Sequence, residues 1–224
     1  MNKFNRFKDA PWFPKEDVHT VVGGAGGIGS WLTLLLSRAG FKPIVFDFDT
    51  LEEHNLGGQF FSKRQIGKTK VEALEENVQI FADETITQFN EKFTKDTMID
   101  KFCFSAFDNM EARKTMFERW VEVHGQDPTA IYIDGRLTAE QLQIFCITPD
   151  RIDAYRKHLF DDSEVEDAPC TFKQTSHSAA MIASHMVAFF TNHYTNVVEK
   201  DNSRSVPFFW EYFIPIDYLN IETE

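Results

Sequence analysis

Short apolar runs alternate with longer segments of helical periodicity along most of this chain. Apolar runs of about four to eight residues predict buried strands, whereas apolar residues that recur every three or four positions predict helices. We expect strands at 18–22, 43–46, 85–89, 101–106, 130–134 and 141–148. We expect helices at 28–39, 68–80 and 110–123, and a fourth at 175–194 that is apolar on almost all sides and therefore deeply buried.

The order of these elements predicts an α/β fold, with a Rossmann-like, mostly parallel central sheet and helices on both faces. No helix fits between 130–134 and 141–148, so the sheet turns antiparallel at that connection. A polar turn at 192–205 leads to two closing strands, 207–213 and 216–221, which complete an antiparallel C-terminal portion.

Two stretches carry little regular pattern. Residues 1–17 combine aromatic and basic residues with prolines, which indicates an N-terminal arm that packs on the body of the protein. Residues 150–175 include five acidic residues between 161 and 167 and indicate an irregular crossover loop. We see neither an internal repeat nor a low-complexity linker, so we expect a single domain over residues 1–224.

Composition restricts the class of protein. With 224 residues, 42% of them hydrophobic, the chain can bury the core of one domain. The net charge is 23 − 35 = −12, which argues against nucleic acid and anionic membranes as partners. We find neither a signal peptide nor an apolar run of ~18 residues, so we expect a cytoplasmic protein without a membrane partner. Three cysteines without a C-x-x-C pair argue against a disulfide framework and against a structural zinc.

The stretch from residue 21 to residue 50 carries the first candidate chemistry. Gly24, Gly26 and Gly29 form G-x-G-x-x-G between the first expected strand and the first expected helix. Asp47 ends the second expected strand, 21 residues after Gly26. A glycine turn lets the backbone approach a ligand, a helix start attracts an anion, and a carboxylate at the strand tip can bind ribose hydroxyls. The stretch therefore predicts a nucleotide site without specifying the nucleotide.

Two further charged residues are candidates, each with an ordinary structural alternative. Lys70 falls in the first turn of the helix at 68–80, where a cation is unfavourable unless it faces an anion. The alternative is a solvated surface lysine. Asp108 follows the strand at 101–106 and should project from the same edge of the sheet as the glycine turn. The alternative is a carboxylate that only caps the next helix.

Five motifs follow one another along the chain: G-x-G-G-x-G-S at 24–30, D-F-D-T at 47–50, N-L-x-x-Q at 55–59, I-G-x-x-K-V-E at 66–72 and F-D-N at 107–109. In this order and spacing they resemble the ThiF/MoeB/HesA superfamily, the ubiquitin-activating-type adenylating enzymes. The resemblance extends from about residue 3 to residue 190 and corresponds to a minimal version of these enzymes.

The resemblance implies that ATP and Mg²⁺ activate the C-terminal carboxylate of a ubiquitin-like protein or peptide, with release of pyrophosphate, in a homodimer. It assigns Asp47 to the ribose, and Asn55 and Lys70 to the triphosphate. It assigns Asp108 to Mg²⁺ and Arg6 to catalysis, in some relatives within the site of the partner subunit. The cofactor site that it implies comprises Gly24, Gly26, Gly27, Gly29, Asp47, Asp49, Asn55, Gln59 and Lys70.

The chain departs from these enzymes at three points. Many relatives have an arginine for phosphate where this chain has Gly58, and Lys63 and Arg64 are the candidates to replace it. The paired C-x-x-C zinc site of many relatives is missing, so we expect no zinc. Cys170 lies where several relatives carry a thioester-forming cysteine, but the acidic run before it disfavours a thiolate. A covalent role for Cys170 and an incidental one both remain open.

Two other functions also remain open. An NAD-dependent oxidoreductase would use the same glycine turn, but no catalytic Tyr/Lys or His/Asp set is evident, and Lys70 and Asp108 would have no role. A degenerate nucleotide-binding scaffold of the same fold is favoured by Gly58.

Overall fold

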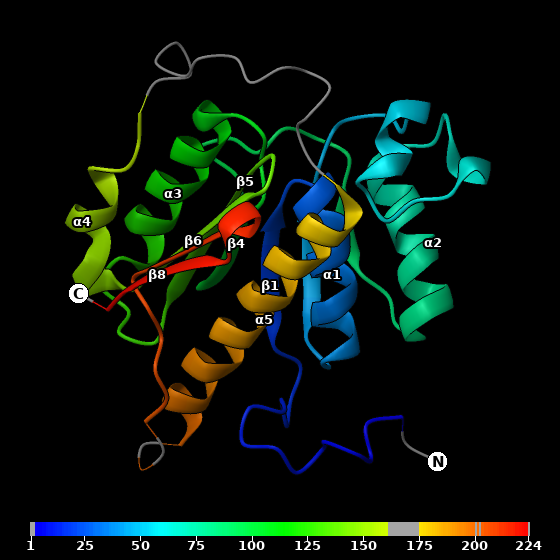
Figure 1. Cartoon of the computed structure of the whole chain (residues 1–224). Helices are drawn as coiled ribbons and strands as arrows, with labels where there is room; N and C mark the ends of the chain where they lie inside the picture. Colours follow the sequence, from blue (N-terminus) through cyan, green and yellow to red (C-terminus); the bar gives the residue numbers. More distant parts are fainter. Residues whose placement is uncertain (1–2, 161–174, 200, 202, 224) are drawn as a thin grey trace.

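The computed structural model describes residues 3–223 except 161–174, 200 and 202. Its centre is a sheet of eight strands in the order β3-β2-β1-β4-β5-β6-β7-β8 (Figure 1). β1 to β5 pair in parallel, and every pairing from β5–β6 onward is antiparallel. The strands are β1 (His19–Gly23), β2 (Lys42–Phe46), β3 (Thr87–Phe89), β4 (Phe102–Ser105), β5 (Ile131–Thr138), β6 (Gln141–Ile147), β7 (Phe209–Phe213) and β8 (Tyr218–Glu222). The Rossmann-like α/β class and the antiparallel C-terminal portion are confirmed.

Helices cover both faces of this sheet. One face carries α1 (Gly27–Arg38), α2 (Lys70–Ala82) and α5 (Ser176–Val198). The other face carries α3 (Met110–His124) and α4 (Ile152–Arg156). Short 3-10 turns are η1 (Glu53–Gly57), η2 (Lys63–Gln65), η3 (Pro149–Arg151) and η5 (Ile214–Ile216).

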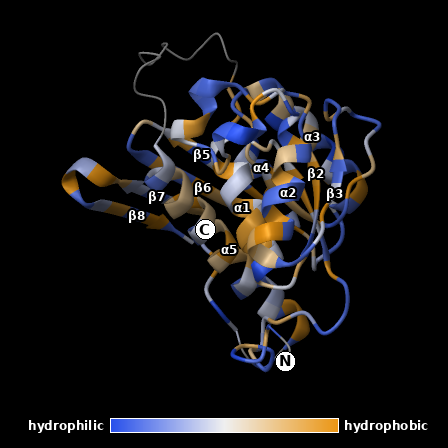
Figure 2. Ribbon diagram, turned by 90° about the vertical axis from the view of Figure 1, so that its right-hand side faces the viewer, coloured by the Kyte–Doolittle hydropathy of each residue, from blue (hydrophilic) through white to orange (hydrophobic). Residues whose placement is uncertain are grey.

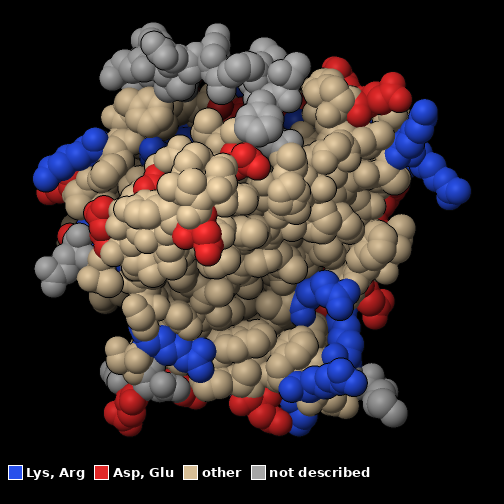
Figure 3. Space-filling model, viewed as in Figure 1, with Lys and Arg blue, Asp and Glu red and all other residues tan. Residues whose placement is uncertain are grey.

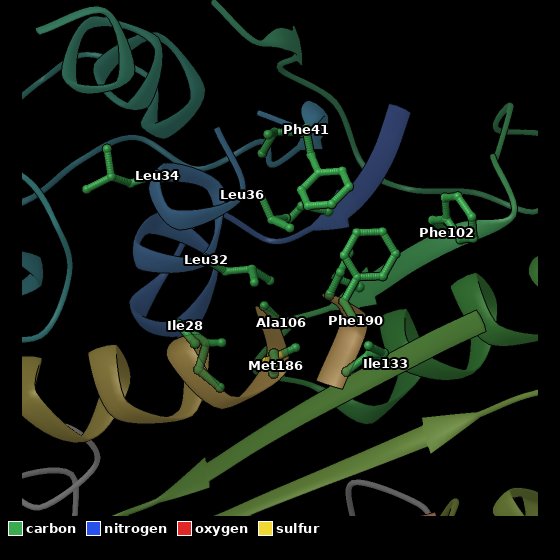
Figure 4. Close-up of a cluster of buried hydrophobic side chains, with 14 of the residues drawn as sticks. Ile28, Leu32, Leu34, Leu36, Phe41, Phe102, Ala106, Ile133, Met186 and Phe190 are labelled. Carbon is green, nitrogen blue, oxygen red and sulfur yellow. The ribbon is translucent and has the colours of Figure 1, made fainter. Parts of the chain in front are cut away.

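Alternate residues of the inner strands point into two separate cores. Val22 and Phe104 pack on the α1 and α5 side, whereas Val21 and Cys103 pack on the α3 side. Figure 4 shows the first core, where Phe190 of α5 lies among side chains from α1 and the sheet. Because these strands are buried on both faces, they read as continuous apolar runs, which is why the sequence predicted them well.

Helix α5 is longer than the sequence pattern predicted. It continues to Val198, so the prediction of a polar turn from residue 192 was wrong. Asn192 donates a 2.9 Å hydrogen bond to the carbonyl of Ser205, and Asn196 donates one of 2.8 Å to the carbonyl of Arg204. The returning chain thus satisfies the polar side chains of the helix, and the helix does not need to end before them.

Burial of α5 is one-sided, so the prediction of burial on all sides was also wrong. The outer side carries Ala180, Ser184 and Ala188, which are exposed or half-buried. Alanine counts as apolar in a sequence pattern but has little surface to bury. The buried side holds Ser178, Ala179, Ile182, Ala183, Met186, Phe190, His193, Tyr194 and Thr195.

The crossover at 150–175 starts with regular structure rather than irregular loop. Tyr155 of α4 is fully buried, with its ring centroid 4.7 Å from that of Phe117. Ile152 and Ala154 pack partly against the same core, and this helix of five residues is too short for periodicity to reveal.

The N-terminal arm lies at the edge of the sheet where the parallel strands begin (Figure 1, bottom). Phe13 and Pro14 pack against Gly40, in the turn before β2. Lys3 donates a 2.8 Å hydrogen bond to the carbonyl of Ala82 at the end of α2. Basic side chains gather toward this lower edge of the face in Figure 3. The arm therefore lies at the opposite edge of the sheet from the glycine turn.

At the other end of the chain, β7 and β8 form a hairpin that projects from the body (Figure 2). Ile216 in its turn and Ile221 in its edge strand are 69% and 53% exposed. Among the helices of the described residues, none has the length and apolar character to cross a membrane.

Candidate functional site

The glycine turn joins β1 to α1 at the C-terminal edge of the parallel strands. Gly24 has φ +92°, a left-handed conformation that side chains disfavour. Its N–H donates a 2.8 Å hydrogen bond to the carbonyl of Phe46, which ties the turn to β2. An ideal Cβ at Gly29 would lie 1.8 Å from the carbonyl oxygen of Gly24. Only glycine at both positions lets α1 start so close to the strand, with its free N–H groups at the sheet edge.

Asp47 lies directly beside this turn. One carboxylate oxygen accepts a 2.7 Å hydrogen bond from the backbone N–H of Ala25, and the other accepts one of 2.8 Å from the N–H of Asp49. The side chain is buried, and burial raises its pKa above the ordinary value, while the nearby Lys70 ammonium partly opposes that rise. The carboxylate is therefore held in one orientation at the tip of β2, where the sequence predicted it.

Lys70 is the first residue of α2 and is buried rather than exposed. Its side chain is 9% exposed, and its ammonium nitrogen lies 2.6 Å from a carboxylate oxygen of Asp49. The backbone N–H of Lys70 also donates to the carbonyl of Asp49, at 2.9 Å. The surface-lysine interpretation is wrong, and the anion that the first-turn position required is, in this structure, Asp49.

The loop after β2 folds over the glycine turn. The Oγ of Ser30 accepts a 2.9 Å hydrogen bond from the N–H of Phe60, and the Trp31 indole donates one of 3.4 Å to the carbonyl of Gly58. These bonds bring Gln59 to within 4.0 Å of where a side chain on Gly26 would begin. Gln59 is buried, and its side-chain oxygen has no hydrogen-bond partner within the described structure.

Asn55 lies in η1 of the same loop, half-buried. Its side-chain oxygen accepts a 2.8 Å hydrogen bond from the N–H of Glu52 and so caps this turn. Lys63 is exposed and lies 3.6 Å from Glu53, whereas Arg64 is exposed in η2. Both basic residues belong to the segment that links the loop to α2.

Asp108 follows β4 and is exposed beside the glycine turn. Gly24 contacts this connection, because an ideal Cβ on it would lie 2.9 Å from the carbonyl oxygen of Ala106. The cap of α3 is Asn109, whose side-chain oxygen accepts a 2.9 Å hydrogen bond from the N–H of Ala112. The helix-cap interpretation of Asp108 is therefore wrong, and its exposed carboxylate faces solvent at the sheet edge.

A buried ion-pair network fixes the connection between β4 and α3, and the sequence did not predict it. The guanidinium of Arg113 pairs with Asp134, and it donates to the carbonyls of Phe107 and Gly135. Arg136 donates to Asp134 at 2.7 Å, and the Tyr155 hydroxyl does so at 2.8 Å. These cations and hydrogen bonds hold the pKa of Asp134 below its usual range despite its burial. An arginine on α3 thus fixes the backbone that carries Asp108.

Two candidate residues are not brought to this site. Arg6 is exposed, and the N-terminal arm to which it belongs lies at the opposite edge of the sheet. Cys170 lies outside the described residues, as does the acidic run that precedes it. Most of the other candidates meet at one edge of the sheet: Gly24, Gly26, Gly27, Gly29, Asp47, Asp49, Gln59, Lys70 and Asp108. Asn55 lies in the adjoining loop, where its side chain bonds to Glu52.

The residues at this edge fit a nucleotide and a magnesium ion. The open turn at Gly26 and the unpartnered oxygen of Gln59 leave space and an acceptor for a bound group. Within the described residues no three His, Cys, Asp or Glu side chains gather to hold a metal by themselves. Mg²⁺ typically takes one or two carboxylates together with phosphate oxygens, which the single carboxylate of Asp108 matches.

The fold and this site define a Rossmann-like α/β protein, of the type that takes a nucleotide where the glycine turn meets the sheet edge. A family model described as the ThiF family matches residues 15–216. The chain belongs to the ThiF family.

Curated relatives match a shorter part of the chain. Ubiquitin-like modifier-activating enzyme 5 of Bombyx mori is 36% identical over 110 residues, which cover 41% of this chain and 28% of that protein. The enzyme of the same name from Dictyostelium discoideum is 34% identical over 111 residues, which cover 49% of this chain and 26% of that protein. The match therefore spans little more than a quarter of the length of these relatives.

Solved structures share the fold over nearly the whole chain. E. coli MccB with ATP superposes with a TM-score of 0.73 at 15% identity, covering 100% of this chain and 71% of that one. MccB with AMPCPP and MccA gives a TM-score of 0.74 at 14% identity, covering 99% and 71%. PaaA gives 0.67 at 16% identity, covering 92% and 72%.

Proposed function

We propose that this chain is an ATP- and Mg²⁺-dependent adenylyltransferase. It activates the C-terminal carboxylate of a ubiquitin-like protein or a peptide and releases pyrophosphate. The observation that carries the proposal is the convergence of the glycine turn, Asp47 and Lys70 at one edge of the sheet in a member of the ThiF family. MccB, which has been solved with ATP and with MccA, and the enzyme 5 relatives support the substrate class.

The chemistry requires cations at this edge. A carboxylate that attacks an α-phosphate brings two anions together, and charge develops on the bridging and leaving oxygens. Lys70 is the buried cation of the site, and Asp49 holds it there until a more strongly charged anion arrives. Asp47 orients the nucleotide through the ribose hydroxyls, because both of its oxygens are already fixed by backbone N–H groups.

The remaining residues complete the proposed site. Asp108 would hold Mg²⁺, which supplies positive charge to the triphosphate. Gln59 and the glycine turn would pack against the nucleotide, and Asn55 would face the phosphates. Gly58 supplies no cation for the phosphates, and we assign that role to Arg64. Lys63 is the weaker candidate, because its charge is partly neutralised by Glu53.

The proposal extends to the setting of the enzyme. We place it in the cytoplasm as a homodimer in which each chain is a single adenylation domain. Arg6 then serves the site of the partner subunit, because the arm that carries it lies at the opposite edge of the sheet from the site of its own chain. The proposal includes transfer of the acyl group to a thioester at Cys170, whose P-C-T segment resembles the thioester-forming cysteine of several relatives.

Calorimetry on purified protein tests the nucleotide. ATP with Mg²⁺ and NAD⁺ are titrated separately into the wild type and Asp47→Ala. Binding of ATP alone, weakened by the substitution, is the expected result. Binding of NAD⁺ alone would reverse the proposal in favour of an oxidoreductase.

A second measurement separates an enzyme from a scaffold. Pyrophosphate release is followed with ATP, Mg²⁺ and a set of peptides and ubiquitin-like proteins with free C-termini. Turnover that disappears in Asp108→Ala supports the proposed chemistry. Tight ATP binding without any release of pyrophosphate across the set would favour the degenerate scaffold.

A further inference from the structure

A second pocket lies at the edge of the sheet opposite the nucleotide site. It is formed where β6 ends, beside the beginning of β5, because Ile147 pairs with Tyr132. The C-terminal part of α5 closes one side, with His193 2.8 Å from the carbonyl oxygen of Thr129. The returning segment at 204–206 closes another side. The cavity volume is about 340 Å³, in the range of small-molecule sites.

The lining of this pocket is polar and cationic. It includes Arg151, Arg204, Asn196 and Ser205, and among the residues that the structure describes no Asp or Glu lines it. The chain carries 35 acidic residues against 23 basic ones, so a described lining that contains two arginines and neither Asp nor Glu is not what its average surface would give. The charges concentrate where a negatively charged ligand would sit.

Neither arginine is neutralised by a carboxylate within the described structure. Arg151 donates only to backbone carbonyls, at 3.2 Å to Val206 and 2.8 Å to Thr223. The side chain of Arg204 is half-buried and makes no hydrogen bond or ion pair with described residues, although its backbone is fixed at 2.7 Å by Asn196. One guanidinium is therefore held in place and the other is available to a ligand.

Two other effects on the charge of the pocket are smaller. The C-terminus of α5 contributes about half a negative charge, which two full positive charges outweigh. Burial together with nearby Lys101 and Arg151 lowers the pKa of His193, opposed by its bond to Thr129 and by Asp127, so this imidazole adds no charge at neutral pH. The described lining of the pocket therefore carries a net positive charge at neutral pH.

We infer that this pocket binds a small molecule through a phosphate or carboxylate group. Arg204 receives the oxyanion with its planar fork of donors, and Arg151 supplies a fixed positive charge beside it. Ser205 and Asn196 line the same cavity and give such a ligand further polar neighbours. The inference concerns a site separate from the nucleotide site and does not rest on the proposed function.

The test is calorimetric titration with inorganic phosphate, and separately with succinate, at constant ionic strength. The proteins are the wild type, Arg204→Gln, Arg204→Lys, Lys70→Met and Arg38→Gln. Lys70→Met weakens phosphate binding at the nucleotide site, and Arg38→Gln removes one exposed positive charge elsewhere. The melting temperature of each variant confirms folding.

We expect the wild type to bind and Arg204→Gln to bind at least tenfold more weakly, because one charged hydrogen bond is lost. Arg204→Lys keeps the positive charge but lacks the planar fork of donors, so its affinity should lie between those of the wild type and Arg204→Gln. Lys70→Met and Arg38→Gln should retain this binding. The stronger of the two probes identifies phosphate or carboxylate as the preferred group. Binding that is lost in Lys70→Met and unchanged in Arg204→Gln overturns the inference, as does the absence of binding for both probes.

Discussion

The ammonium group of Lys70 and the carboxylate of Asp49 form a 2.6 Å ion pair in which the two partners are unequally exposed. The lysine side chain is 9% exposed and the aspartate side chain 46%. Water can therefore solvate Asp49 if the pair separates, whereas Lys70 stays at the site. This asymmetry lets a phosphate replace the carboxylate as the partner of Lys70 without leaving a buried charge alone.

Replacement of Lys70 by methionine should lower the rate of pyrophosphate release by ~10²-fold, because one cation facing the developing charge is lost. Steady-state kinetics with saturating ATP measures the effect. Lys68→Met is the matched control, since Lys68 pairs with Glu76 where both side chains are about 40% exposed. Equal rates for the two variants would remove Lys70 from the catalytic set.

Gly29→Ala should abolish nucleotide binding and destabilise the fold by about 3 kcal/mol, because the new methyl group would overlap the carbonyl of Gly24 and force α1 from the strand. Gly57→Ala is the control in the adjoining loop, where an added Cβ meets nothing within 4 Å. Urea unfolding and ATP titration of both variants give the comparison. An alanine tolerated at Gly29 would mean that the helix start is not fixed by this contact.

Asp108 and Asn109 are adjacent but should fail in different ways. Asp108→Ala should remove Mg²⁺-dependent turnover while leaving the stability nearly unchanged, since its carboxylate is exposed. Asn109→Ala should cost about 1 kcal/mol of stability, because it removes the cap of α3. Activity titrated with Mg²⁺ and denaturant unfolding, measured on both variants, distinguish the two roles. The reverse pattern would assign the cap to Asp108.

Burial of Asp47 predicts a particular pH dependence of stability. The folded pKa lies above the unfolded value of 3.8, so the folded state holds this proton more tightly. The stability that the protonated form contributes is complete below the unfolded pKa and is lost as pH rises through the folded pKa. Asp47→Asn removes this ionisation, so its stability relative to the wild type should rise from pH 4 to pH 7, although its amide can accept only one of the two backbone hydrogen bonds and it should bind ATP less well.

Denaturant unfolding at pH 4 and pH 7 checks this prediction for Asp47. The stability difference between Asp47→Asn and the wild type should grow from the lower to the higher pH. A difference that is the same at both values would show that burial does not set the ionisation of this side chain.

The network under the Asp108 connection should carry a large share of the stability. Asp134→Asn leaves Arg113 and Arg136 buried without a counter-charge and should cost about 3–5 kcal/mol at neutral pH. Because the pKa of Asp134 is lowered, the wild type should lose this stability only as pH falls below the ordinary range of a carboxyl group. Arg156→Met, which breaks a surface pair with Glu118, should cost less than about 1 kcal/mol. Denaturant unfolding of both variants tests the contrast.

The sequence predicted the glycine turn and the strand that ends in Asp47 because both depend on neighbours within a few residues. Gly24, Gly26 and Gly29 act through local backbone geometry, and the apolar runs around them reflect strands buried on two faces. Such patterns survive in a single sequence without any knowledge of the tertiary fold. The positions of the parallel strands follow from them with little error.

The sequence could not predict contacts that depend on the packed sheet. Arg113 and Asp134 are 21 residues apart, and their pairing requires α3 to lie across β5. A charged residue in the middle of a buried helix face was the available signal, and it gives no partner. The prediction that α5 is buried on all sides was wrong for another reason. Alanines on its outer side count as apolar in the sequence pattern, but the part of the fold that the structure describes leaves them exposed or half-buried.

The position of the N-terminal arm bears on how many chains contribute residues to one site. The N-terminal arm that carries Arg6 lies at one edge of the sheet and the candidate nucleotide site at the other, so we infer that this arginine does not serve the site of its own chain. If Arg6 takes part, each working centre is assembled from two polypeptides. An Arg6→Ala chain and a Lys70→Met chain, each inactive alone, would then complement each other on mixing, because half of the centres in their hybrid contain neither substitution.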